Sequence, residues 1–288
     1  MSLRQKLNNA HGRMLSRQSA WRGQRSRTLL VPNQWDGSVQ QFYHFLLGYL
    51  MPVALWVESH PRRSVTLRDC GPMRPWLDLL GRQVDLEVVQ PGHALHLMAG
   101  HRIRHTVLPG LDNPNRFKRK TLEKGTQALR RCLNLPEPIR DSCREVTVIA
   151  RETNDDFYHG PGSETHMSGS MRRSIPNLRA AAEAIAGTTV VDFASWSPHE
   201  QVVRMQGTRV LVGQHGAGLA QMIWMPIGGS VIEVRPPLPP QVENLFERLA
   251  HILGHSYRRI SQQSVHSPVD PEVLERAIVD EMKSLSSW

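Results

Sequence analysis

Val210-Leu-Val-Gly-Gln-His-Gly-Ala-Gly-Leu219 is the segment that says most about the fold of this 288-residue chain. An apolar run, typical of a buried strand, ends in a loop with three glycines, and a helical segment follows at once. Glycines let backbone N–H groups approach a phosphate, and a helix N-terminus adds positive partial charge. A tight strand-to-helix turn is the alternative interpretation. His215 favours the anion site, because a turn has no need of an imidazole.

Short apolar runs alternate with helical segments around this loop. Strands are predicted at 146–150, 189–193, 210–213, 230–234 and 256–260. Helices are predicted at 176–186, from Ser197-Pro198 onward, directly after the glycine loop, and at 241–253. Strands that alternate with helices of about 10–15 residues predict a parallel sheet covered by helices on both faces.

The first half of the chain shows a weaker form of the same pattern. A helix is predicted at 42–57 with a kink at Pro52, strands at 64–67 and 84–89, and further helices at 76–80 and 122–133. A proline-containing linker is predicted at 134–141, and a last helix at 271–285.

We therefore predict an α/β protein with two Rossmann-like domains that face a central cleft. The N-terminal domain spans 1–140 and includes a basic arm, and the second domain spans 141–262. Residues 263–288 form a C-terminal helix that is expected to pack back on the N-terminal domain.

The charge of the chain is distributed unevenly. The 35 Lys and Arg against 26 Asp and Glu give a net charge of +9. Residues 1–144 hold 23 basic and 10 acidic side chains, whereas 145–288 hold 12 and 16. Only basic charges precede Asp36: Arg4, Lys6, Arg13, Arg17, Arg22, Arg25 and Arg27. A solvated arm and peripheral contact with an anionic membrane are both open interpretations.

Location signals are few. The longest apolar run, Phe45 to Val57, contains Pro52 and is too short to cross a bilayer, and no signal peptide opens the chain. Cys70, Cys132 and Cys143 are odd in number and have no CxxC spacing. We expect a cytoplasmic protein, with contact to the inner membrane face as an option.

Glu233 stands one strand after the glycine loop, within Val231-Ile-Glu-Val234. A carboxylate near the carboxyl edge of a parallel sheet suits contact with ribose hydroxyls, because ligands bind at that edge. The alternative is a glutamate at an exposed strand end that pairs with an arginine.

The segment from Gly213 to Val234 resembles the signature of glycosyltransferase family 61: an HGAGL loop, a helix, a Met-Pro-x-Gly turn and a strand that ends in Glu. The resemblance is close from about 144 to 236. Further elements are similar to the family pattern: Arg151 after a strand, Arg173 with Asn177, Val191-Asp-Phe193 with Glu200-Gln201, and Phe42-Tyr-His-Phe-Leu46 with Pro52.

The resemblance implies a GT-B-like arrangement, with 1–140 as the acceptor-side domain and 141–262 as the nucleotide-sugar-binding domain. It also implies inverting sugar transfer from a nucleotide-diphosphate donor, usually a UDP-sugar. The basic acceptor-side domain favours a glycan or lipid-linked saccharide as the acceptor. The donor-binding residues that the resemblance implies are Arg151, Arg173, Asn177, Gly213, His215, Gly216, Ala217, Gly218, Leu219 and Glu233. No D-x-D triplet occurs in the chain. We therefore expect arginines and loop amides to neutralise the diphosphate, with no metal and no other cofactor.

His44 is the hypothetical catalytic base, because an imidazole titrates near neutral pH. The alternative is a histidine that caps an aromatic helix, and Asp36 is the second candidate for the base.

Other functions stay open on the sequence alone. A non-catalytic nucleotide- or polyanion-binding module would keep the glycine loop, and a nucleic-acid binder would use the basic half but not the loop, so no nucleic acid is expected. Two weaker features are a candidate zinc site and a candidate cation site, formed by His93, His96, His101 and His105 and by Asn154-Asp155-Asp156. A third is the basic Arg116–Lys120 run, for which a nucleic-acid contact, a solvated turn and a patch for an anionic acceptor are all open interpretations.

Overall fold

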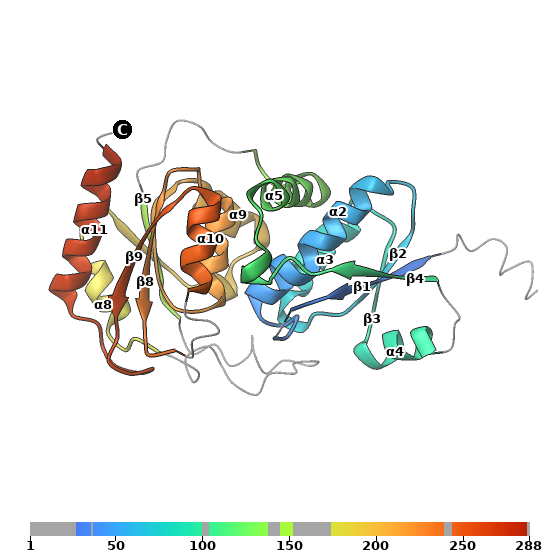
Figure 1. Cartoon of the computed structure of the whole chain (residues 1–288), viewed down its shortest axis with the longest axis horizontal. Coiled ribbons are helices and arrows are strands. Elements are labelled where there is room, and N and C mark those ends of the chain that lie inside the picture. The colour runs from blue at the N-terminus through green and yellow to red at the C-terminus, as the bar shows by residue number, and fades with distance from the viewer. Residues whose placement is uncertain are drawn as a thin grey trace, which may run out of the picture.

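The computed structural model describes residues 27–35, 37–99, 104–137, 145–151, 174–238 and 244–286 (Figure 1). Several features expected from the sequence lie outside these ranges: the basic residues 4 to 25, Asp36, His101, Cys143, Asn154 to Asp156 and Arg173. The predicted linker is described only as far as Glu137, so the boundary at 140 stays a prediction.

Two separate parallel sheets form the framework of the chain. The first contains β1 (Thr28–Asn33), β2 (Val65–Arg68), β3 (Leu86–Val89) and β4 (Arg104–Pro109), in the order β3-β2-β1-β4. The second contains β5 (Glu145–Ile149), β6 (Thr188–Val191), β7 (Thr208–Gln214), β8 (Ser230–Arg235) and β9 (Ser256–Ser261), in the order β6-β5-β7-β8-β9. The predicted α/β class is confirmed, and two parallel sheets with helices are compatible with a GT-B-like fold.

Helices cover both faces of the second sheet. One face carries α8 (Leu178–Glu183) and α11 (Pro271–Ser286), and the other carries α9 (Pro198–Gln206), η5 (Ala217–Trp224) and α10 (Leu245–Leu253). Strand residues alternate accordingly, with Val210 and Val212 in one core and Leu211 in the other. Burial on both faces explains why these strands read as continuous apolar runs.

The prediction that the C-terminal helix packs on the N-terminal domain is wrong. Leu274, Ala277 and Ile278 of α11 are buried in the same core as Val210 and Val212 of β7. The apolar stripe of α11 therefore fits the second sheet, beside α8 (Figure 1).

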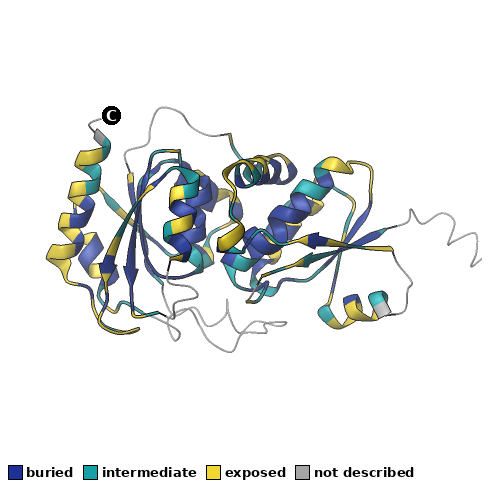
Figure 2. Cartoon of the chain, viewed as in Figure 1, coloured by how far each residue is buried: buried dark blue, intermediate teal, exposed yellow. Residues whose placement is uncertain are grey.

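The first sheet has a thick helical layer on one face. η1 (His44–Leu50) continues into α2 (Met51–Ser59), and these pack with α3 (Arg74–Gly81) and α5 (Arg119–Leu133). The other face carries α4 (Pro91–Ala99), much of which is exposed (Figure 2).

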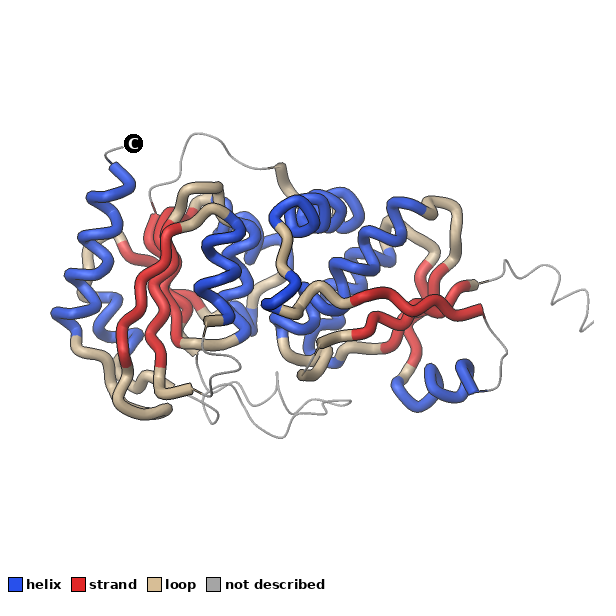
Figure 3. Tube along the Cα trace, in the orientation of Figure 1, coloured by secondary structure: helices blue, strands red, loops and turns tan. Residues whose placement is uncertain are grey.

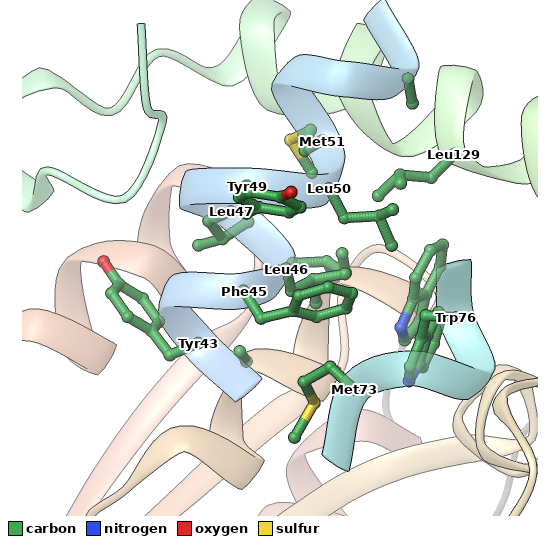
Figure 4. Packing of buried hydrophobic residues seen from close by; sticks show 14 of the residues in the cluster. Tyr43, Phe45, Leu46, Leu47, Tyr49, Leu50, Met51, Met73, Trp76 and Leu129 are labelled. Carbon is green, nitrogen blue, oxygen red and sulfur yellow. The ribbon is translucent and has the colours of Figure 1, made fainter. Parts of the chain in front are cut away.

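The helical layers of the two sheets share one apolar core. Figure 3 shows helices lying between the two groups of strands. Trp76 of α3 stacks on Trp224 of η5, with ring centroids 6.2 Å apart and planes at 10°, and the Arg130 guanidinium lies over Trp224. Figure 4 shows Phe45, Leu46 and Leu50 of η1 packed toward this region. The two sheets are thus joined by buried rings as well as by the chain.

Three elements of the first half are absent from the sequence prediction: β1, α4 and β4. Arg27, counted with the basic arm, belongs to the fold, because its guanidinium pairs with Asp85 at 2.5 Å just before β1. Pro52 is the second residue of α2, but the backbone before it is already helical, because η1 runs directly into α2. Proline has no N–H to donate, and the irregular part of this helix is the π-helical η1 that directly precedes it.

The strand order reverses at one place in each sheet, between β1 and β4 and between β5 and β7. In open parallel sheets, ligands bind outside the carboxyl ends of the strands at such a reversal. The fold therefore marks two places for a site, one on each sheet. Among the described residues, no helix has the length and apolar character needed to span a membrane.

Candidate active site

Arg151 and the glycine loop meet at the reversal point of the second sheet. Arg151 follows β5 and Gly216 follows the neighbouring β7. A Cβ atom added to Gly216 would collide with the Arg151 guanidinium, so this cation lies directly against the glycine. Gly216 has an extended backbone, with φ 162° and ψ 175°. The Arg151 guanidinium therefore occupies the space that a side chain at position 216 would fill.

The remaining loop residues pack the loop onto the sheet. A Cβ on Gly218 would lie 3.4 Å from Ile149 Cγ2, and one on Gly213 would lie 3.1 Å from Leu219 Cδ2. The Leu219 N–H donates to the Gly216 carbonyl at 3.0 Å inside η5, which begins at Ala217. The Leu219 amide is thus already bonded, and the phosphate contact predicted for this loop falls to the amides of residues 216–218.

His215 is held by a buried carboxylate. Its Nδ1 hydrogen-bonds to Glu233 Oε1, and the Tyr257 hydroxyl donates to Glu233 Oε2. His215 is 4% exposed and Glu233 1%. Burial and the charge of Glu233 raise the pKa of Tyr257 well above its usual value, so this phenol stays a donor. Both Glu233 oxygens already have a protein partner. The predicted contact with the ribose stays a prediction, and it requires one of these oxygens to accept a second hydrogen bond.

Asn177 is bonded to the main chain of a distant segment. Its Nδ2 donates to the Val269 carbonyl at 2.7 Å, and its Oδ1 accepts from the Val269 N–H at 2.9 Å. The buried amides of Gln214 and Gln262 are bonded to each other at 3.0 Å in the same region. Asn177 therefore fastens the segment after β9, and its predicted role in donor binding stays a prediction.

A second histidine–carboxylate pair lies at the reversal point of the first sheet. His44 Nδ1 is 2.8 Å from Asp112 Oδ2, and the Asp112 side chain is fully buried. The Trp35 N–H donates to Asp112 Oδ1 at 2.9 Å. Asp112 follows β4 and Trp35 follows β1, so the carboxylate joins the ends of the two strands between which the order reverses. A buried carboxylate needs this hydrogen bonding to remain charged.

Glycines make room for the Asp112 carboxylate and for the His44 ring. A Cβ added to Gly48 or to Gly110 would lie 2.8 Å from a carboxylate oxygen of Asp112. Gly37 has φ +69°, and a Cβ there would collide with the imidazole of His44. The backbone therefore closes around the pair, and the His44 side chain keeps 15% exposure.

A chain of aromatic contacts joins the two histidines. Tyr43 meets the His44 ring edge-on, with centroids 5.0 Å apart, and meets Phe246 of α10 at 5.8 Å. Phe246 in turn meets His215 at 5.1 Å. Tyr43 points away from the η1 core side chains in Figure 4. The two pairs therefore belong to one region of the molecule, with one pair supplied by each sheet.

A family model described as Glycosyltransferase 61 matches residues 42–232, which include His44, Asp112, Arg151 and the glycine loop. The chain belongs to glycosyltransferase family 61. It is therefore a glycosyltransferase, an enzyme that transfers a sugar from a donor to an acceptor. No curated protein sequence matches the chain.

The sequence analysis of this glycosyltransferase missed Asp112, Tyr257 and Phe246. Asp112 could have been found, because it follows an apolar run, Thr106 to Leu108, and a glycine, which is the pattern of an acid at a strand end. Tyr257 and Phe246 carry no such signal.

The described histidines of the candidate zinc site lie on α4 and β4. His93 and His96 lie in α4 with ring centroids 6.5 Å apart, and the exposed His105 lies in β4 at the edge of the sheet. Within the described ranges, no three His, Cys, Asp or Glu side chains are grouped so that they could hold a metal ion.

Proposed function

We propose that this enzyme transfers a sugar, with inversion, from a nucleotide-diphosphate donor, a UDP-sugar, to a hydroxyl group of a glycan or lipid-linked saccharide. The observation that carries the proposal is the His44–Asp112 pair, linked through Tyr43 and Phe246 to His215 of the glycine loop. A base on one sheet and an anion-binding loop on the other are what a direct displacement requires.

His44 acts as the general base in this proposal. Its Nε2 takes the proton of the acceptor hydroxyl while that oxygen attacks the anomeric carbon from the side opposite the diphosphate. The bond between the anomeric carbon and the diphosphate oxygen breaks, and its electron pair leaves with the diphosphate. Asp112 accepts the Nδ1–H and stabilises the imidazolium that forms.

Arg151 and the loop amides stabilise the departing diphosphate. Arg151 lies against Gly216, so one guanidinium and the N–H groups of residues 216–218 are close enough to share an anion. The chain contains no D-x-D triplet, and a fixed cation supplies the charge that such a triplet would bring with its metal. We therefore propose transfer that needs neither metal nor another cofactor, so that activity persists in excess EDTA.

The first half of the chain supplies the acceptor side. Its excess of basic residues, including exposed Arg116, Lys118 and Lys120, suits an anionic glycan or a lipid-linked acceptor. We propose a cytoplasmic location with peripheral contact to the anionic inner membrane face through the basic residues before β1. Co-pelleting with anionic vesicles at low salt, lost at high salt, tests this contact, and no pelleting at low salt contradicts it.

The transfer proposal is tested by donor binding followed by turnover. A UDP-sugar held at 100 times its dissociation constant adds about 2.7 kcal/mol of stability, so a thermal-shift panel identifies the donor. With that donor, His44→Ala is expected to lose roughly 10²–10⁴-fold in sugar release or transfer while it keeps UDP binding. His60→Ala, which removes an exposed histidine of the same half, is the matched control.

Near-wild-type turnover of His44→Ala would refute the base assignment. Donor binding by the wild-type protein without any sugar release would instead favour the non-catalytic nucleotide-binding module.

A further inference from the structure

Trp35 is unusual among the aromatic residues of this protein. Its side chain is 38% exposed, and no other Phe, Tyr or Trp in the described part of the chain belongs to the exposed class. It belongs to neither of the two apolar cores, whereas Trp76, Trp224 and Phe246 are buried in the shared one. An indole is a large apolar surface, so its exposure at a defined place needs an explanation.

The position of Trp35 supplies that explanation. The backbone N–H of Trp35 donates to Asp112 Oδ1 at 2.9 Å, and the other oxygen of the same carboxylate is hydrogen-bonded to His44 Nδ1 at 2.8 Å. Trp35 follows β1 at the reversal point of the first sheet, where parallel sheets bind ligands. The backbone that carries the exposed ring is therefore bonded to the same carboxylate that positions the proposed base.

The backbone around Trp35 is fixed while its ring remains exposed. The preceding residue, Gln34, donates from Nε2 to the His44 carbonyl at 3.1 Å, and Gly110 N–H donates to the Asn33 carbonyl at 2.8 Å. Asn33, two residues before Trp35, is exposed as well. An aromatic platform on a fixed backbone, with an amide beside it, loses little conformational entropy when a ligand binds.

We infer that Trp35 is the stacking platform for a pyranose ring of the acceptor, the ring whose hydroxyl is presented to His44. The inference rests on the proposed function and adds the acceptor's chemical class and its subsite. A pyranose has an apolar face of C–H groups and a polar rim of hydroxyls. The indole covers the face. Asn33 at the end of β1 and His44 at the start of η1 are the polar side chains that would meet the rim.

The experiment uses simple sugars as probes, so it does not depend on knowing the natural acceptor. Methyl β-D-glucopyranoside, methyl β-D-galactopyranoside, methyl α-D-mannopyranoside and N-acetylglucosamine are each added at millimolar concentration for saturation-transfer NMR. We expect transfer to the C–H protons of at least one sugar in the wild type and in Trp35→Phe. Trp35→Ala is expected to weaken the binding of that sugar about tenfold.

Leu95→Ala is the matched control, because it removes a 67% exposed apolar side chain from α4 of the same half. It is expected to keep the wild-type signal. Equal sugar affinity in wild type and Trp35→Ala, or no signal from any of the four sugars with the wild type, would overturn the inference.

Donor-side measurements separate this inference from the proposed function. Trp35→Ala is expected to keep the UDP affinity of the wild type and, once an acceptor is in hand, to raise its KM with little change in kcat. A wild-type protein that stacks a sugar on Trp35 but releases no sugar from any UDP-sugar would refute the proposed transfer and leave the subsite standing.

Discussion

His44–Asp112 and His215–Glu233 are built on the same plan in two different sheets. In each pair a buried carboxylate accepts from the imidazole Nδ1. The first pair lies where the strand order reverses, between β1 and β4, and the second joins the residue after β7 to the neighbouring strand β8. A carboxylate at Nδ1 fixes the tautomer of the ring and leaves Nε2 to face the substrate. The protein thus prepares one oriented imidazole on each side of its site.

The two pairs differ in how the second carboxylate oxygen is used. The second oxygen of Asp112 accepts a hydrogen bond from the backbone N–H of Trp35, and the His44 side chain is 15% exposed. The second oxygen of Glu233 takes the Tyr257 hydroxyl, and the His215 side chain is 5% exposed. We call His44–Asp112 the open pair, because its imidazole can exchange a proton with an acceptor, and His215–Glu233 the closed pair, because it holds a loop in one orientation. Changes to the open pair are therefore expected to lower kcat, and changes to the closed pair to lower UDP affinity.

The largest effect is expected from Asp112→Asn. The amide keeps the size of the carboxylate but offers no negative charge to the His44 imidazolium, and it favours the wrong tautomer. Transfer is expected to fall roughly 10²–10⁴-fold in kcat, with UDP affinity unchanged. The measurement is steady-state transfer combined with calorimetric UDP titration.

Asp85→Asn provides the control for this change, because it alters an acid of the same sheet that is paired with Arg27 at the surface. It is expected to keep full turnover. If Asp112→Asn behaved in the same way, the two pairs would not differ in the manner proposed.

The sequence predicts the second sheet better than the first for a physical reason. Runs such as Val210 to Gly213 are buried on both faces, so their apolar character is continuous and their ends are clear. β1 contains Pro32 and follows a basic stretch, and β4 is exposed at Arg104, His105 and Val107, because it is the edge strand. Each contains only a short apolar run, Leu29 to Val31 and Thr106 to Leu108, and neither run has clear ends.

The same contrast applies to the site. The approach of Arg151 to the glycine loop follows from the topology alone, because both stand at carboxyl ends of neighbouring parallel strands. The His44–Asp112 contact joins residues 68 positions apart, one on a helix and one after an edge strand, and no local pattern links the two. The sequence therefore suggests His44 as a base, but only the tertiary structure shows that Asp112 orients its ring.

The next largest effect is expected on the pH dependence of folding stability, and it comes from His255, a buried imidazole that has no carboxylate partner in the described structure. It is 4% exposed, its Nε2 donates to the Met222 carbonyl at 3.2 Å, and burial lowers its pKa to about 4. The unfolded chain takes up this proton below about pH 6.5, but the folded protein only near pH 4. Stability from this group is therefore complete above pH 6.5 and falls by roughly 3 kcal/mol as the pH drops to 4.

Urea unfolding of wild type and His255→Gln at several pH values checks this prediction. The variant is expected to lose that part of the slope, and the exposed His199→Gln is expected to retain it. Parallel curves for wild type and His255→Gln would contradict the assignment.

A smaller effect is expected when the closed pair loses its charge in Glu233→Gln. His215 then loses a charge-assisted hydrogen bond, of a kind worth about 1.5–3 kcal/mol. Because His215 adjoins the loop amides, UDP affinity is expected to fall roughly 10–100-fold. Binding of the simple sugars at Trp35 is expected to be unchanged. A loss of kcat with no change in UDP affinity would show that both pairs act in proton transfer.

The smallest effect is expected from Tyr257→Phe, which removes only the hydroxyl that closes the second pair. The variant keeps the His215–Glu233 hydrogen bond but leaves Glu233 Oε2 without its phenolic donor. If the Tyr257 hydroxyl only helps Glu233 to hold His215 and the loop in place, UDP affinity falls a few-fold, in line with one hydrogen bond of about 1 kcal/mol. If Glu233 instead reaches the ribose of the donor, releasing this oxygen strengthens UDP binding. Calorimetric titration with UDP and with uridine, which keeps the ribose but lacks the diphosphate, separates the two cases. A ribose contact strengthens the binding of both, whereas an effect on the loop weakens the binding of UDP alone.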